Sequence, residues 1–250
     1  MTRRMTTLSA VGFGVFFVAS LAIGVRLVAL WARTRQLPEL WIGMGILGIG
    51  PTAMGCMLTA AALVDTAPGL SRALTGVALC AIAVGNTAAC VFNWRVFRPE
   101  SRAARAWVLC TALLFAAAIL GEAALTGFAS PLRPGRGGHV ISYLSTTNLL
   151  WGAAESLRYW VLMRRRLRLG LADPIVTNRF LLWGVGIGAA GVGSVISLLS
   201  QTVTGHSMAE LPWLKLSNSM HGLASAVLMW IAFLPPAAWK RAILARYASR

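Results

Sequence analysis

Seven apolar segments dominate this chain, and each is long enough to cross a lipid bilayer as one helix, which takes about 20 residues. The segments are residues 9–31, 39–64, 71–97, 106–129, 140–163, 177–203 and 212–236. Only short connections separate them, which leaves no room for a soluble domain between two spans. The sequence therefore predicts an all-α fold, a polytopic membrane bundle of seven transmembrane helices in one domain, 1–250.

Composition favours a membrane protein over a soluble or nucleic-acid-binding one. Charged residues make up 12% of the chain and hydrophobic residues 57%, whereas soluble domains carry about 25% charged residues. The net charge of +16 would suit nucleic acid, but Lys and Arg occur between the apolar segments, as they do in cytoplasmic loops. We therefore expect the lipid bilayer as the partner, and no nucleic acid.

The distribution of basic residues predicts the orientation of the bundle. Most of the 23 Lys and Arg residues fall on the side that carries Arg98, residues 164–168 and the C-terminal tail. Membrane proteins keep such residues on the cytoplasmic side. The prediction is an N-terminus outside and a C-terminus inside, in a multi-pass protein of the cell inner (plasma) membrane.

A glycine pattern suggests an internal repeat. Shifting the chain by 143 residues superposes the second span on the sixth, and their glycines coincide. The coinciding positions are Gly43, Gly45, Gly48 and Gly50 with Gly186, Gly188, Gly191 and Gly193. The pattern predicts two parallel three-helix repeats, 1–105 and 140–250, joined by a linker helix within 106–139, a 3+1+3 layout known from transporters.

Two local features predict departures from straight spans. Gly48, Gly50 and Pro51 lie together in the second span, and proline inside a helix removes a hydrogen bond and kinks it. In the tail, 237–250, apolar and basic residues alternate at helical spacing. This pattern is typical of an amphipathic helix that lies on the cytoplasmic leaflet.

The fifth span carries the strongest candidate for a binding site. Asn148, Trp151, Glu155 and Arg158 follow the spacing of one helix face. Charged groups at membrane depth normally face the bundle interior or a water-filled cavity, and are candidates for function. Glu155 and Arg158 can pair, and the pair is interpreted either as a structural ion pair or as a ligand or proton site.

Two further polar residues join the candidate ligand-binding set. Glu122 is a second buried carboxylate, in the outer half of the fourth span, and Asn86 shares a face of the third span with Asn93. Asparagines within spans also serve as hydrogen-bond partners between helices. We expect no metal, no cofactor and no enzymatic activity, because no metal-ligand spacing and no nucleophile–base motif can be assembled from the sequence.

Three runs of sequence carry a resemblance: LMRRRLRLGLADPIVTNRFLLWG, LWARTRQLPELWIG and FNWRVFRP. They resemble segments of uncharacterised bacterial membrane proteins with seven transmembrane helices. The resemblance implies a bacterial inner-membrane protein, and it transfers no activity and no site residue. The layout also resembles sugar-transporter-like bundles, although the chain lacks the Pro-Gln motif of the PQ-loop group.

The leading functional prediction is a sensor or receptor-like bundle. A small, largely apolar ligand would bind in the outer half, its polar end met by the candidate residues of the fourth and fifth spans, with Trp151 and Trp183 nearby. A cytoplasmic protein partner would then read the helix positions at the Arg-rich loops. The alternatives are a small-solute transporter built from two repeats and a non-catalytic scaffold subunit, and the sequence leaves the oligomeric state open.

Overall fold

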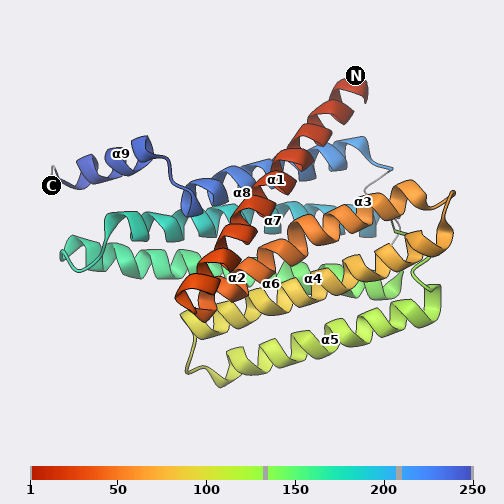
Figure 1. Cartoon of the computed structure of the whole chain (residues 1–250), viewed down its shortest axis with the longest axis horizontal. Coiled ribbons are helices and arrows are strands. Elements are labelled where there is room, and N and C mark those ends of the chain that lie inside the picture. Colours follow the sequence, from red (N-terminus) through yellow and green to blue (C-terminus); the bar gives the residue numbers. More distant parts are fainter. Residues whose placement is uncertain (1, 132–134, 207–209, 249–250) are drawn as a thin grey trace.

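The computed structural model describes residues 2–131, 135–206 and 210–248, and the side chains of all of these except 2–6 and 248. Over these ranges the chain consists of helices joined by short turns, with no strand (Figure 1). Arg133 and Arg250, which count toward the predicted orientation, lie outside the described residues, as do the side chains of Arg3 and Arg4.

The helices follow the apolar segments closely. They are α1 (Thr2–Thr34), α2 (Leu37–Leu47), η1 (Gly48–Thr52), α3 (Ala53–Leu63), α4 (Pro68–Phe97), α5 (Arg102–Thr126), α6 (Arg136–Arg168), α7 (Pro174–Thr204), α8 (Pro212–Phe233) and α9 (Ala237–Ala248). Within the described ranges, six helical stretches are long and apolar enough to cross a membrane. The predicted multi-pass membrane bundle is confirmed at this level, and α6 is not one of the six.

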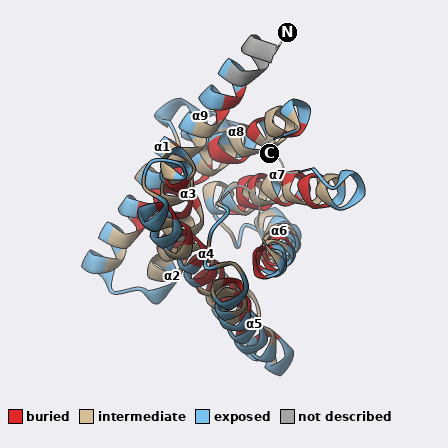
Figure 2. Cartoon of the chain, turned by 90° about the vertical axis from the view of Figure 1, so that its right-hand side faces the viewer, coloured by how far each residue is buried: buried red, intermediate tan, exposed pale blue. Residues whose placement is uncertain are grey.

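Helices that follow one another in the chain are neighbours in space. α1 contacts α2, α2 contacts α4, α4 contacts α5, α5 contacts α6, α6 contacts α7, and α7 contacts α8. α8 then contacts α1, which closes a ring. α4 also contacts α6 directly, so α5 lies on the outside of the bundle (Figure 2).

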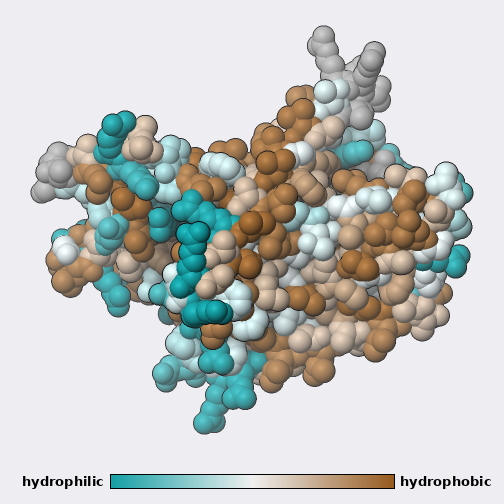
Figure 3. Space-filling view, viewed as in Figure 1, coloured by the Kyte–Doolittle hydropathy of each residue, from teal (hydrophilic) through white to brown (hydrophobic). Residues whose placement is uncertain are grey.

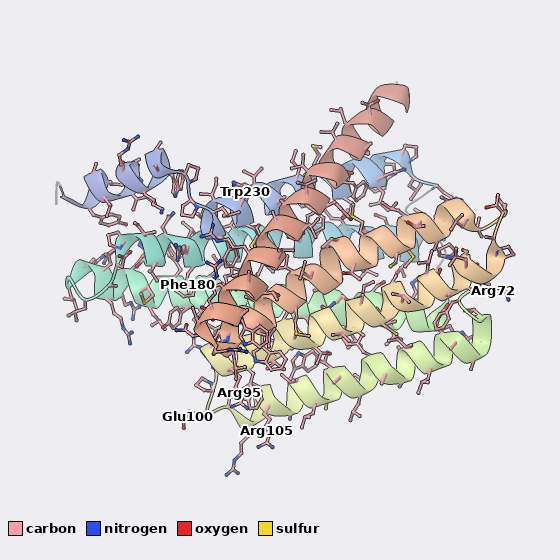
Figure 4. The ribbon with its side chains drawn as sticks, in the orientation of Figure 1. Arg72, Arg95, Glu100, Arg105, Phe180 and Trp230 are labelled. Carbon is pink, nitrogen blue, oxygen red and sulfur yellow. The ribbon has the colours of Figure 1, made fainter. Side chains whose placement is uncertain are left out.

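The two ends of the bundle differ in shape and polarity. At one end α4 and α5 stop, whereas α6 and α7 continue past them and α9 runs alongside (Figure 1). Hydrophobic surface covers the middle of the bundle, and hydrophilic residues gather toward this end and around the α4–α5 turn (Figure 3). We call it the Arg-rich end, because Arg95 and Arg105 lie here, while Arg72 lies at the opposite end (Figure 4).

Two hydrophobic clusters form the core. One joins α4, α5 and α6 around Phe115 and Ile141. The other joins α1, α2, α4 and α7, where Trp183 stacks on Phe92 with ring centroids 5.0 Å apart. Interior packing therefore connects the two halves of the chain through α4, which contributes to both clusters.

The predicted kink of the second span is a π-helical turn. η1 (Gly48–Thr52) contains Pro51 and lies between α2 and α3 without breaking the helix. Proline has no N–H to donate, and a wider turn accommodates its ring. Gly48 faces α4 so closely that an added Cβ would lie 2.7 Å from the carbonyl oxygen of Ala81. The glycine is thus required by the approach of two backbones.

The C-terminal tail forms α9 (Ala237–Ala248), which contacts α7. It runs roughly along the long axis of the bundle (Figure 1). α9 extends from the Arg-rich end (Figure 1), and its place on the cytoplasmic leaflet stays a prediction.

Candidate functional site

Glu155 of α6 is the centre of the candidate site. Its side chain is only 9% exposed, and it pairs with two arginines. Arg98 donates from Nε to Oε1 at 2.9 Å, and Arg158 donates from Nη1 to Oε2 at 3.4 Å. The expected Glu155–Arg158 pair therefore forms, and the shorter contact comes from an arginine that the sequence analysis did not select.

The α4–α5 turn positions Arg98. Pro99 follows it, and a residue before proline is disfavoured in the α conformation, so α4 ends at Phe97. Arg98 takes φ −140° and ψ 46° as the C-cap. Ser101 then caps α5, its Oγ accepting from the backbone N–H of Ala104 at 3.2 Å. A tight turn with defined ends thus holds the guanidinium against α6.

The contact with Arg98 shows at which level of the bundle the Glu155 carboxylate lies. Glu155 lies level with the end of α4 and the start of α5, because it is bonded to the turn between them. Glu155 therefore lies at the Arg-rich end of the bundle, whereas its sequence context predicts a group at membrane depth. The side chains of Arg98 and Arg158 are 41% and 54% exposed, so the pair is buried on one side only.

A groove of about 360 Å³ opens beside the ion pair, between α5 and α6. Its lining includes Arg98, Ser101, Trp107, Thr147, Trp151 and Glu155. A second hollow, of about 380 Å³, is lined by the α4–α5 turn and by Arg158 of α6. The two arginines around one carboxylate therefore border two open spaces. The first groove combines indole rings with a cation, which suits an amphipathic molecule.

Asn148 acts on the groove through Trp107. Its Oδ1 accepts from Trp107 Nε1 at 3.1 Å. Asn148 is 4% exposed, and its Nδ2 has no hydrogen-bond partner among the described residues. The amide thus fixes the indole of Trp107 in the groove wall, while Trp151 of α6 forms part of the same wall.

Glu122 belongs to a different part of the molecule. Its carboxylate accepts from the backbone N–H groups of Gly135 and Gly138, at 3.0 and 3.1 Å, and from the Thr126 hydroxyl at 2.9 Å. Glu122 lies 21 residues beyond Ser101 on the same helix, which is about 31 Å. The structure therefore does not bring Glu122 and Glu155 together at one site. Glu122 instead caps the first turn of α6.

Asn86 and Trp183 also lie away from the groove. Asn86 donates from Nδ2 to the carbonyl of Ile82 and to Ser145 Oγ, at 2.9 and 3.1 Å, so it links α4 to α6. Trp183 stacks on Phe92 in the core. Neither lines the groove. Of the predicted site residues, Trp151 and Glu155 line the groove at the Arg-rich end, and Asn148 contacts its wall through Trp107.

Sequence reasoning missed Arg98, Ser101 and Trp107. All three flank the α4–α5 turn, and Arg98 is 57 residues from Glu155 along the chain. The available signal was the turn itself, where Arg98, Pro99 and Ser101 mark a helix end and a helix start. These residues predict where α4 ends and α5 begins, but they do not predict which helix the Arg98 side chain contacts.

The described residues hold no group of three or more His, Cys, Asp or Glu side chains that could bind a metal ion. Of the three histidines, His206 lies 3.6 Å from Glu210, and His221 contacts the carbonyl of Ser217 at 2.8 Å. Comparisons with protein-family models, curated proteins and solved structures found no match to this chain. The residues of the groove are therefore the basis for a functional proposal.

Proposed function

We propose that the protein is a membrane-embedded sensor that binds a small amphipathic ligand in the α5–α6 groove and acts through a cytoplasmic protein. The observation that carries the proposal is the Arg98–Glu155–Arg158 triad at the groove. Glu155 is almost fully buried, yet both arginines that neutralise it are about half exposed. A second anion can reach Arg98 from the groove, because Arg98 forms part of its wall.

The ligand chemistry follows from the lining. Trp107 and Trp151 offer apolar surface, and Arg98 offers a guanidinium that binds carboxylates and phosphates through paired N–H groups. A ligand with an apolar body and an acidic head would compete with Glu155 for Arg98. The contact between the α4–α5 turn and α6 would then loosen.

Such a contact is suited to signalling because a ligand shifts an equilibrium only by binding one state better than the other. The ligand would favour the state in which Arg98 has left Glu155. α6 carries Glu155 in its middle and continues to Arg168, so a change at Glu155 reaches the end of the helix. A cytoplasmic partner would detect that end.

This mechanism needs seven membrane spans, which are the six candidate spans together with α6. α6 packs along α5 from Gly138, bonded to Glu122, to Glu155, a length of about 26 Å. The hydrocarbon core of a bilayer is about 30 Å thick. The positive-inside rule supports an N-terminus outside and the Arg-rich end inside the cell, in a bacterial inner membrane.

Thermal unfolding in neutral lipid nanodiscs tests the ligand proposal. Decyl phosphate and decanoate should raise the midpoint of unfolding, whereas decanol, which has the same chain without the charge, should not. Arg98→Gln and Trp151→Ala should abolish the shift, and Arg105→Gln, a nearby exposed arginine, should keep it. An equal shift with decanol, or a shift that survives Arg98→Gln, would rule out the groove as an acid-recognising site.

A small-solute transporter is the second candidate, supported by the helix contacts. Let α1, α2/α3 and α4 form one repeat, and α6, α7 and α8 the other. The symmetry then places α6 where α1 stands and α4 where α8 stands, so the α1–α8 contact requires an α6–α4 contact. Both contacts occur. The π-helical turn at η1 would serve as a hinge. Uptake of labelled solutes by proteoliposomes favours this candidate, whereas absence of both uptake and ligand shifts favours a scaffold subunit.

A further inference from the structure

The α6–α7 hairpin continues well past the end of its neighbours. α6 runs on from Glu155 to Arg168, about 20 Å beyond the level of the α4–α5 turn. α7 returns to that level at Phe180, whose ring lies 6.1 Å from the ring of Phe97. We call residues 159–180 the α6–α7 extension. It projects from the Arg-rich end beside α9 (Figure 1).

The extension is strongly basic. Its arginines are Arg164, Arg165, Arg166, Arg168 and Arg179. Its one acidic residue, Asp173, is used as the cap of α7, where Oδ1 accepts from the N–H groups of Ile175 and Val176 at 2.7 and 2.9 Å. α9, which contacts α7, adds Lys240, Arg241 and Arg246 and no acidic residue. The excess of positive charge is therefore not neutralised within the extension itself.

In the proposed topology, these arginines lie farther from the hydrocarbon core than the lipid headgroups do. The polar layer of a bilayer adds only about 5–8 Å on each side of the hydrocarbon core. Arg164 lies nine residues past Glu155, about 13 Å along the helix, and Arg168 lies farther still. With Glu155 at the edge of the core, these side chains stand beyond the headgroups. Arginines that serve only to set the membrane orientation do not need to stand this far from the hydrocarbon core.

Exposed apolar side chains accompany the charge. Leu169 and Leu171, in the turn between α6 and α7, are 72% and 73% exposed. Large apolar groups on a surface outside the lipid are typical of protein contacts. Flanked by arginines, they match a partner that offers apolar and acidic groups together.

We propose that the α6–α7 extension binds an acidic, amphipathic helical segment of a cytoplasmic protein. The inference rests on the proposed function for its orientation and for the existence of a partner. Leucines of the turn would contact the apolar face of that segment, and the arginines would pair with its carboxylates. Because Glu155 and the extension share α6, ligand binding and partner binding are then coupled in both directions.

Binding of designed peptides to the full chain in phosphatidylcholine nanodiscs tests the inference. The probe is a labelled 18-residue helical peptide with Leu on one face and Glu elsewhere, measured by fluorescence anisotropy at about 0.15 M salt, where exposed charges are largely screened. Two control peptides replace every Glu by Gln or every Leu by Ser. Only the parent peptide should bind tightly.

Chain variants locate the surface. The triple change Arg164→Gln, Arg165→Gln and Arg166→Gln should weaken binding of the parent peptide at least tenfold. Leu169→Ser with Leu171→Ser, which leaves the charge unaltered, should weaken it several-fold. Arg102→Gln with Arg105→Gln, which removes two exposed charges at the α4–α5 turn, is the control and should change it less than twofold. An unchanged unfolding midpoint confirms that each variant is folded.

Three results would overturn the inference. One is equal weakening in the α4–α5 control, which means that net charge alone attracts the peptide. Another is equal binding of the Leu-to-Ser peptide. The third is loss of parent-peptide binding when anionic phosphatidylglycerol replaces part of the lipid, which identifies a lipid surface as the occupant of the arginines. The assay contains neither decyl phosphate nor decanoate, so peptide binding that persists in Arg98→Gln keeps this inference even where the ligand proposal fails.

Discussion

Arg98 and Glu155 are joined at 2.9 Å although 57 residues separate them in the chain. The bond ties the turn between α4 and α5 to the middle of α6, and it forms one wall of an open groove. It links the most buried carboxylate of the Arg-rich end to a partly exposed cation. Removing either partner therefore affects both the stability of the bundle and access to the groove.

A double-mutant cycle should show that Arg98 is the main partner of Glu155. Removing one partner of a buried pair leaves the other charge uncompensated, but exposure of the arginines reduces the effect. We expect a coupling free energy of about 1–2 kcal/mol between Arg98→Gln and Glu155→Gln, and less than about 1 kcal/mol for Arg158→Gln with Glu155→Gln. Unfolding in mixed detergent micelles measures both, and a larger coupling to Arg158 would contradict the geometry.

Trp107→Phe should lower the free energy of unfolding by more than the loss of buried apolar surface between Trp and Phe accounts for. The phenyl ring cannot donate to Asn148 Oδ1, so both polar atoms of a buried amide are left without a partner. Such a loss costs about 1–3 kcal/mol. Asn148→Leu in the same chain removes the unpaired groups and should restore most of the lost stability. If the double variant is no more stable than Trp107→Phe alone, the amide is not the cause.

The helical bundle could be predicted from the sequence because a bilayer permits only helices or closed barrels to cross it. The second predicted span, 39–64, matches the helical stretch Leu37–Ala62 together with its π-helical turn. The fifth, 140–163, was predicted too short, since α6 runs from Arg136 to Arg168. Apolar length reports only the apolar part of a helix, and α6 continues past it through the arginines of 164–168.

The site was predicted only where it depends on spacing along one helix. The Glu155–Arg158 contact follows from positions three apart on α6. Arg98 could not be selected, because its contact depends on which helices are neighbours and on how the chain turns after α4. Glu122 and Glu155 are both in the predicted ligand-binding set, although the sequence already places them toward opposite ends of their spans. The rise of a helix per residue separates the two carboxylates by the thickness of the hydrocarbon core.

Glu122→Gln should open the first turn of α6 without affecting the groove. The carboxylate accepts from the N–H groups of Gly135 and Gly138, whereas the amide of Gln turns a donor toward one of them. Hydrogen exchange should therefore accelerate in peptides that cover residues 135–142. Peptides around Glu155 should exchange as before, and stabilisation by decyl phosphate should persist. Faster exchange at both ends of α6 would mean that the ends are not independent.

Gly48→Ala should be strongly destabilising, because its Cβ would lie 2.7 Å from Ala81 O and 2.9 Å from Gly85 Cα, both backbone atoms of α4. The helices must separate to admit it, which costs about 1–3 kcal/mol. Gly14→Ala is the matched control, since a Cβ there meets nothing within 4 Å, and it should stabilise its helix by about 0.5–1 kcal/mol. Similar unfolding midpoints for the two variants would argue against the close approach of η1 to α4.

Cysteine labelling from one side of the membrane should distinguish the two ends of the bundle. In a chain whose native cysteines are replaced, Leu171→Cys reports the α6–α7 turn and Thr66→Cys reports the turn between α3 and α4. Both turns are exposed, and they lie at opposite ends of the bundle (Figure 1). With the Arg-rich end inside the cell, an impermeant maleimide added to intact cells should label Thr66→Cys only. After the membrane is opened, both should react. Labelling of Leu171→Cys in intact cells would reverse the orientation and remove the cytoplasmic partner from the proposed mechanism.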